Sequence, residues 1–343
     1  MKSLPLKIAS LLSATWMVCL SGCLGSADNE VVVYSALDKE FSQPILQEIE
    51  RELGVTVLSK FDVESNKTVG LVTELIQQRK RPRADIFWNN EVLHTIRLQQ
   101  MGLLEPWIPD ASAAIPATFK ATDGSWTGFA ARARVLIVNT TLIPDVGDYP
   151  DSFFDLADPR WSNRCGMARP LFGTSATHAA VLFDRLGVEA AARWYQQIQS
   201  NAVIEGGNRQ VAIKVGRGEL AFGLTDTDDA MLEIDKGNPV VIVYPDQAES
   251  QSGTLLIPNT ICLIAGGPNS ERARAVVARL LEADIESRLA EGASAQFPLN
   301  PEVLVLSRAN PPASLKVMDA DFESAASAWD TTARKLAEIF SAK

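Results

Sequence analysis

Three carboxylates that could bind a cation stand close together in the second half of the chain. Asp226, Asp228 and Asp229 lie at the start of a helix predicted over 227–236, directly after Thr225. The helix dipole favours carboxylates at this position, so one of them could serve only as a cap. Three within four residues exceed what a cap needs, and they suit an amine or a metal ion. A calcium loop is not indicated, because its spaced oxygen ligands and glycine turn are missing.

Two arginines could bind an anion. Arg132 and Arg134 alternate within a long β-like stretch over 126–138, so both side chains lie on one face of the strand. A guanidinium can hold a phosphate or a carboxylate through two hydrogen bonds. The alternative is a salt bridge inside the protein.

A second group suited to an anion precedes an apolar helix predicted over 175–186. The segment Gly173-Thr174-Ser175-Ala176 brings hydroxyls, free N–H groups and the positive end of a helix to one point. The alternative is that Ser175 only caps its own helix.

No pattern of an enzyme stands out. The sequence lacks the Gly-x-Ser-x-Gly, P-loop, His-Glu-x-x-His and Gly-x-Gly-x-x-Gly patterns. Its two histidines, His94 and His178, fall within predicted helices and are expected to be structural. We therefore predict a protein that is not an enzyme and has no cofactor. Cys165 and Cys262 are expected to be buried free thiols, with a disulfide as the alternative.

The N-terminus resembles the signal peptide of a bacterial lipoprotein. Lys2 and Lys7 precede an apolar stretch over 8–20, which is too short to cross a bilayer. Leu20-Ser21-Gly22-Cys23 then has the form of a lipobox. We predict a signal peptide over 1–22, lipid attachment at Cys23 and an extracytoplasmic, lipid-anchored protein in the periplasm or on the cell surface. The alternative is a plain secretory signal.

The acidic character of the chain bears on its partners. The formal charge is −10, and cleavage that removes Lys2 and Lys7 makes it −12. Such a charge disfavours nucleic acid and an anionic membrane surface as partners. The lipid anchor is therefore the one membrane contact that we expect.

The elements that must position these groups form two α/β series. In the first, strands at 31–35, 55–58 and 85–88 alternate with helices at 41–53, 66–79 and 91–101. Their apolar strands predict a parallel sheet covered by helices. In the second, strands are predicted at 164–168, 219–224, 240–244 and 254–265, with helices at 175–186, 188–200, 208–215, 227–236, about 270–290 and 321–340. Ligands lie beyond the carboxyl ends of such strands. The loops at 34–41, 61–68, 88–91, 169–177, 206–210 and 225–229 are therefore expected to line a cleft.

Several motifs recur in the order of a known family. They are Val31–Glu40, Arg83–Trp88, Met101–Pro106, Trp126–Gly128, Arg132–Val135, Gly218–Asp226 and Pro298–Pro301. Together they resemble the ferric-ion-binding branch of the bacterial solute-binding proteins of ABC importers, whose relatives bind phosphonates, thiamine or polyamines. The resemblance covers roughly residues 30–305.

The resemblance implies a fold, a partner and a site. It implies a two-lobed α/β periplasmic-binding-protein (type II) fold with a hinge and an interlobe cleft, with lobe one at 30–130 plus 256–306 and lobe two at 131–255 plus 307–343. It also implies a monomer that closes on a small-molecule or metal-associated solute and presents it to an ABC permease. The solute contacts expected from the patterns and the resemblance together are Ser35, Ala36, Asp38, Asn66, Asn89, Asn90, Arg132, Arg134, Thr174, Ser175, Ala176, Asn208, Thr225, Asp226 and Asp228.

The ferric ligands of the family do not carry over. Its paired tyrosines fall on Thr227-Asp228, its histidine on Asp38 and its glutamate on Asn90. The part of the family's cleft that holds an accompanying anion matches better, because its residues fall on Thr174, Ser175, Ala176 and Asn208. The expected solute is therefore small and anionic or metal-associated, and the ligand set of any metal stays unknown. The alternatives are a structural outer-membrane lipoprotein and a hydrolase on the same fold.

Overall fold

The computed structural model describes residues 29–62 and 68–341. The predicted signal peptide over 1–22, Cys23 and Asn66 lie outside these residues. Among the helices within them, none is both long enough and apolar enough to cross a membrane.

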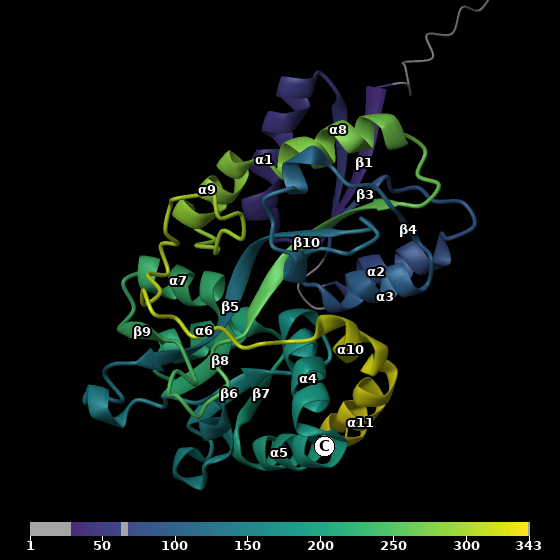
Figure 1. The fold of residues 1–343 in the computed structure, drawn as a ribbon. Coiled ribbons are helices and arrows are strands. Elements are labelled where there is room, and N and C mark those ends of the chain that lie inside the picture. Colours follow the sequence, from purple (N-terminus) through teal and green to yellow (C-terminus); the bar gives the residue numbers. More distant parts are fainter. Residues whose placement is uncertain (1–28, 63–67, 342–343) are drawn as a thin grey trace, which may run out of the picture.

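The first α/β series forms a parallel sheet, as predicted. Strand β1 (Glu30–Ser35) pairs in parallel with β2 (Thr56–Phe61) and with β3 (Ile86–Asn89). Helices α1 (Lys39–Leu53), α2 (Val69–Gln77) and α3 (Leu93–Gln100) connect and cover these strands in the upper half of Figure 1. Helix α1 ends where Gly54 takes the left-handed conformation, with φ of 64°, which glycine adopts without a steric penalty.

The second series forms the lower half of the molecule in Figure 1. Its strands are β6 (Cys165–Ala168), β7 (Val203–Glu205), β8 (Phe222–Asp226) and β9 (Val240–Val243). Its helices are α4 (Gly173–Leu186), α5 (Val188–Asn201), α6 (Asn208–Gly216) and α7 (Thr227–Asp235). Strand β8 ends later than the predicted strand over 219–224, so Thr225 and Asp226 belong to the strand and not to a loop.

Two long strands join the halves. Strand β5 (Thr127–Asn139) is buried along its whole length, and its first part pairs with β10 (Leu256–Ile264) while its second part pairs with β8 and β9. The strand order is β2-β1-β3-β10-β5-β8-β6-β7, with β4 (Leu104–Glu105) beside β10. Arg132 lies opposite Ile257 of β10, and Arg134 lies opposite Asp226 of β8. The two arginines therefore occupy the place where β5 passes from one half to the other.

The remaining helices lie on the outside. The helical segment predicted over about 270–290 is two helices, α8 (Ser270–Leu280) and α9 (Ala283–Glu291), because Glu282 has an extended backbone. Short 3-10 helices lie at Asp110–Ser112, Ala117–Phe119, Val146–Asp148, Phe153–Ala157 and Pro159–Trp161.

The C-terminal helices α10 (Phe322–Ser327) and α11 (Trp329–Ser341) lie beside α4 and α5 in Figure 1. They also reach the other half. Gln100 of α3 donates a hydrogen bond to Ser327 (3.1 Å), and Arg97 pairs with Asp330 (2.7 Å). The C-terminal segment therefore bridges the two halves.

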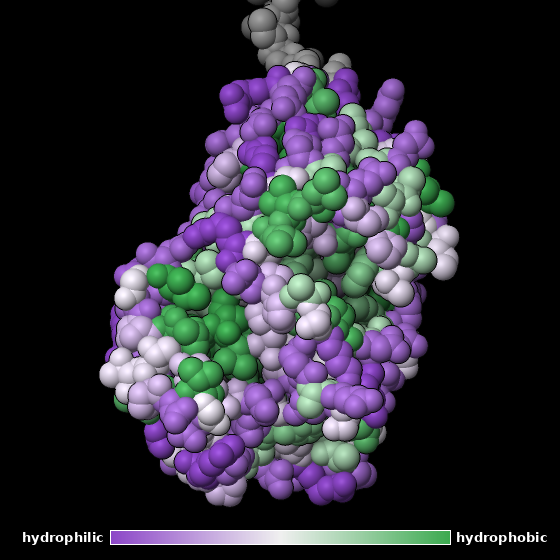
Figure 2. All heavy atoms as spheres, turned by 60° about the vertical axis from the view of Figure 1, so that its left-hand side comes forward, coloured by the Kyte–Doolittle hydropathy of each residue, from purple (hydrophilic) through white to green (hydrophobic). Residues whose placement is uncertain are grey.

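The surface is mostly hydrophilic, and both cysteines of the described residues are free. Hydrophilic side chains cover most of the face in Figure 2, and hydrophobic ones gather in limited patches. Cys165 and Cys262 are buried free thiols, as expected. Burial raises the pKa of the Cys165 thiol to about 12, which keeps this thiol protonated and unreactive.

The buried carboxyl of Asp246 generates a stability prediction. It accepts a hydrogen bond from Ser152 Oγ (2.7 Å), yet burial raises its pKa to about 6. A raised pKa means that the folded state binds the proton more tightly, so stability is lost as the pH rises from about 4 to about 6. Asp246→Asn keeps an acceptor for Ser152 and tolerates the φ of 61°. It should raise the free energy of unfolding by about 1–2 kcal/mol at pH 8.

Chemical denaturation at pH 4 and pH 8 measures this effect. The matched control is Asp148→Asn, which removes the same charge from an exposed position. Equal effects of Asp246→Asn at both pH values would contradict the assignment.

Candidate functional site

A small pocket lies at the junction of the two halves. It opens at the carboxyl ends of β6 and β8 and at the N-terminal ends of α4, α6 and α7. Its volume of about 40 Å³ leaves room for a few water molecules. Side chains of the two halves bond to each other beside it, so the halves are closed on each other. The described residues that line it are Asn90, Arg132, Ala168, Arg169, Phe172, Gly173, Thr174, Ser175, Gly206, Gly207, Asn208, Asp226 and Asp229.

We call the half with β1 to β3 and α1 to α3 lobe one, and the half with β6 to β9 and α4 to α7 lobe two. Arg132 and Arg134 form buried ion pairs with aspartates of lobe two. Arg134 Nη1 lies 2.7 Å from Asp226 Oδ1, and Arg132 Nη1 lies 3.2 Å from Asp228 Oδ2 and 3.7 Å from Asp226 Oδ2. These four side chains are almost inaccessible to solvent. Of the two interpretations left open by the sequence, the structure contains the internal salt bridge.

The ion pairs fix the charge of their members. Burial alone would lower the pKa of Arg132, but the carboxylates of Asp228 and Asp226 outweigh it and raise that pKa. Burial alone would raise the pKa of Asp226, but Arg134 and Arg132 hold it below its ordinary value. Both partners therefore stay ionised inside the protein.

The predicted anion-binding groups converge, and Asp226 is the group that they surround. Thr174 Oγ1 donates to Asp226 Oδ2 (2.5 Å), and Asn208 Nδ2 donates to the same oxygen (2.9 Å). Ser175 Oγ in turn donates to Asn208 Oδ1 (3.0 Å). The capping interpretation of Ser175 is wrong, because α4 begins at Gly173 and its N-cap residue is Phe172.

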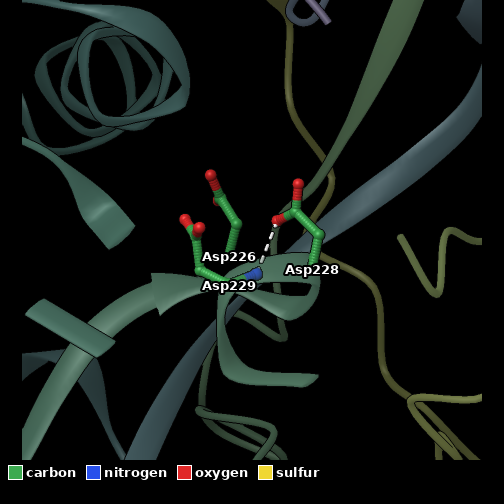
Figure 3. Close-up of side chains that lie close together, drawn as sticks. All are labelled: Asp226, Asp228 and Asp229. Atoms are coloured by element: carbon green, nitrogen blue, oxygen red, sulfur yellow. Dashed lines mark hydrogen bonds between the residues drawn. The ribbon is translucent and has the colours of Figure 1, made fainter. Parts of the chain in front are cut away.

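The three aspartates project to the same side of the β8–α7 turn (Figure 3). Each offers a carboxylate oxygen, and these oxygens lie within 4.8 Å of one another. Asp226 stands at the N-cap of α7 but makes no capping hydrogen bond with its side chain, and Asp228 Oδ1 accepts from the backbone N–H of Asp229 (3.0 Å). Such a set could hold a cation, and the guanidinium of Arg132 supplies positive charge beside two of its members.

The lobe-one side of the pocket is formed by the turn after β3. The backbone carbonyl of Asn90 accepts a hydrogen bond from Arg132 Nη2, and the side-chain oxygen of Asn90 accepts one from Thr68 (2.7 Å). The neighbouring Asn89 is fully buried, and its amide donates to Glu91 (2.8 Å) and to Thr95 (3.0 Å). Asn90 thus lines the pocket, and Asn89 supports the turn behind it.

Some predicted contacts lie beside the pocket and not on it. Ser35 Oγ bonds to the Leu37 carbonyl (3.3 Å), and the backbone of Ala36 donates to Trp88 (2.9 Å). Thr225 donates to the Asn208 carbonyl (3.1 Å), and Ala176 is fully buried in α4.

The predicted contact Asp38 lines a neighbouring surface groove together with Glu40 and Arg209. Arg209 and Glu40 pair across the two halves at 2.7 Å. Their salt bridge is a second contact, beside the pocket, that joins the halves in this closed form.

Glu91, which was not among the residues predicted from the sequence, joins the two halves. Its buried carboxylate accepts hydrogen bonds from Asn89, from the backbone N–H of His94 and from Thr177 Oγ1 of lobe two (2.8 Å), and it pairs with His94 Nδ1 (3.1 Å). Burial alone would raise the pKa of Glu91, but His94 and these hydrogen bonds hold it below its ordinary value. An acidic residue directly after Asn89-Asn90, at the carboxyl end of a strand, was the feature that could have revealed it.

No tyrosine is among the described residues that line the pocket. Tyr34 donates to Glu74 (2.9 Å), and Tyr244 donates to the Ala309 carbonyl (2.8 Å). Tyr149 and Tyr195 pack against the hydrophobic core of the molecule. A pair of tyrosinates could not form here without a large rearrangement.

Comparisons with known proteins find that the chain is similar to binding proteins. A family described as "Bacterial extracellular solute-binding protein" matches residues 84–325. The "Fe(3+)-binding periplasmic protein" of Serratia marcescens is 24% identical over 215 residues, which are 63% of this chain and 62% of that one. The chain therefore matches somewhat less than two thirds of the Serratia protein.

Two further relatives match over longer stretches. The "Major ferric iron-binding protein" of Neisseria meningitidis is 23% identical over 84% of this chain and 86% of its own. The "Putative 2-aminoethylphosphonate-binding periplasmic protein" of Salmonella paratyphi A is 25% identical over 77% of each chain. Both names describe binding proteins, and that of the Salmonella relative places it in the periplasm.

Similarity to solved structures shows the fold of the chain. The ferric binding protein of Campylobacter jejuni superimposes with a TM-score of 0.81 at 20% identity, over 90% of this chain and 99% of that one. The periplasmic binding protein AfuA of Actinobacillus pleuropneumoniae, bound to fructose-6-phosphate, gives 0.79 at 18% identity, over 92% and 99%. These likenesses confirm the predicted two-lobed periplasmic-binding-protein (type II) fold.

The hydrogen bond between Thr177 and Glu91 generates a prediction about closure. Thr177→Val keeps the shape of the side chain but removes the donor from a buried carboxylate that belongs to the other lobe. The closed form should lose about 1–2 kcal/mol relative to the open form. Small-angle scattering of the solute-free protein should then give a larger radius of gyration.

The control is Thr73→Val, the same change on an exposed position of α2. An unchanged radius and melting temperature for Thr177→Val would show that this hydrogen bond does not hold the lobes together.

Proposed function

The chain belongs to the bacterial extracellular solute-binding proteins, and we propose that it is the lipid-anchored solute-binding component of an ABC importer. It captures a small anionic or metal-associated solute in the pocket between its lobes. It then presents the closed, loaded form to a membrane permease. The lobes that close comprise residues 30–130 plus 256–306 and residues 131–255 plus 307–343, and the protein works as a monomer.

One observation carries the proposal: polar groups from both lobes meet in a closed pocket at the junction. Lobe one contributes Asn90, lobe two contributes Thr174, Asn208 and Asp226, and Arg132 lies on the strand that joins them. A few convergent polar groups in a pocket between two bodies are typical of a ligand site. Hydrogen bonds across the junction give closure a structural basis.

The two alternatives find less support. A purely structural lipoprotein gains little from charges buried between its lobes, because ion pairs there barely repay their desolvation. A hydrolase with a serine nucleophile needs a histidine base in reach of it. Burial lowers the pKa of His178 to about 3, its ring packs against Phe153, and among the described residues its Nε2 has no hydrogen-bond partner. His94 is buried against Glu91.

A thermal-shift screen tests the proposal and names the solute class. It covers ferric chelates, phosphonates, phosphate esters, polyamines and thiamine derivatives. Ser175→Ala combined with Thr174→Val should weaken binding of the identified solute about a hundredfold, because losing part of a buried charged network costs on the order of 2–4 kcal/mol. Titration calorimetry measures the change.

The control is Asp235→Ala, which removes a surface ion pair with Arg308 (2.6 Å) away from the pocket and should leave affinity unchanged. Normal binding by the double variant would show that the start of α4 does not contribute to solute binding.

Lipid anchoring is tested at Cys23. The Cys23→Ser protein should no longer be found in the membrane fraction of the native host, because no thiol remains to carry the lipid. Cys19→Ser is the matched control, since that cysteine lies within the expected signal peptide and should not matter. Membrane association of Cys23→Ser without a lipid mass on the protein would overturn the anchor.

A further inference from the structure

Asp226 occupies the place that the sequence assigned to a bound anion. Its two oxygens receive hydrogen bonds from Arg134 Nη1 (2.7 Å), Thr174 Oγ1 (2.5 Å) and Asn208 Nδ2 (2.9 Å), and Arg132 Nη1 lies 3.7 Å away. These donors come from strand β5 and from the starts of helices α4 and α6, which are far apart in the sequence. Donors of this kind around one point are what a phosphate or a carboxylate requires.

The arrangement leaves few hydrogen-bond donors and little positive charge for a second anion. Thr174 and Asn208 each donate a hydrogen bond to Asp226, and the charge of Arg134 is already paired with that carboxylate. A free phosphate in contact with these groups would lie within a few ångströms of the Asp226 carboxylate. Two like charges so close in a buried site disfavour each other strongly.

We propose that Asp226 is a built-in anion, which closes this half of the pocket to free anions, so that the solute is not held there through a phosphate, phosphonate or carboxylate group. The inference rests on the proposed function, because it assumes that the solute binds in this pocket. It removes free anions from the anionic or metal-associated class and leaves the metal-associated solutes.

The rest of the lining carries both signs of charge, because the exposed Arg169 lies on it as well. Asp229 also lines the pocket, and its carboxylate lies within 4.8 Å of those of Asp226 and Asp228. A solute entering between the lobes therefore meets Asp229 beside the paired Asp226 on the lobe-two side. On the lobe-one side it meets the turn of Asn90, whose carbonyl already accepts from Arg132.

Removing the built-in anion tests the proposal. Asp226→Gly leaves Arg134, Thr174 and Asn208 without their shared partner. The variant should melt at a lower temperature than the wild type, and inorganic phosphate or formate should restore it by ~5 °C at saturation. Its affinity for inorganic phosphate should exceed that of the wild type about a hundredfold. The matched control is Asp229→Gly, which removes a carboxylate from the same pocket but leaves these donors paired and should not respond to phosphate.

The outcomes separate clearly. Saturable binding of inorganic phosphate to the wild type, lost in Asn208→Ala, would overturn the proposal even if Asp226→Gly does not fold. An equal phosphate response in Asp226→Gly and Asp229→Gly would overturn it as well. A screened solute whose only charge is a phosphonate or a carboxylate would refute the inference and leave the proposed function standing. A screen without any bound solute would count against the proposed function, while rescue of Asp226→Gly by phosphate would still support the built-in anion.

Discussion

The ion pair between Arg134 and Asp226 is the interaction on which the centre of the molecule depends. Strand β5 is buried along all of its residues, so a guanidinium on it must find a partner inside the protein. The register of the sheet supplies one, because Arg134 lies directly opposite Asp226 on β8. Losing either partner would leave a buried charge uncompensated, which typically costs about 3–5 kcal/mol. The starts of α4 and α6 are positioned around that pair through Thr174 and Asn208.

Arg132 extends this constraint to the other lobe. It lies on the same face of β5, two residues earlier, where the strand pairs with β10. One guanidinium nitrogen reaches the aspartates of lobe two, and another reaches the Asn90 carbonyl of lobe one. Any motion that separates the lobes must therefore break a charge-assisted hydrogen bond at the hinge. The contact between Glu91 and Thr177 adds a second bond of this kind, farther along the same turn.

Much of this architecture could be predicted from the sequence, because the patterns that determine it are local. Alternating apolar runs give the parallel sheet, and the period of a strand places Arg132 and Arg134 on one face. Which partner an arginine finds is decided by strand register, and register depends on contacts between distant segments. The sequence therefore left both the salt bridge and the bound anion open. It also placed Asp226 in a loop and overlooked Glu91, whose partner Thr177 is 86 positions away.

Contacts that hold the lobes closed also limit what a solute can contribute. A ligand shifts an equilibrium between two forms only by the difference in its affinity for them. If the contacts of Arg132 and Glu91 alone made the closed form dominant, the solute would add little, and a permease could not distinguish loaded from empty protein. The proposed function therefore requires a closed form that is only slightly disfavoured without solute, so that a few kcal/mol of binding energy decides the population. Buried ion pairs suit this role, because their attraction and their desolvation nearly cancel, which holds the lobes in register without locking them.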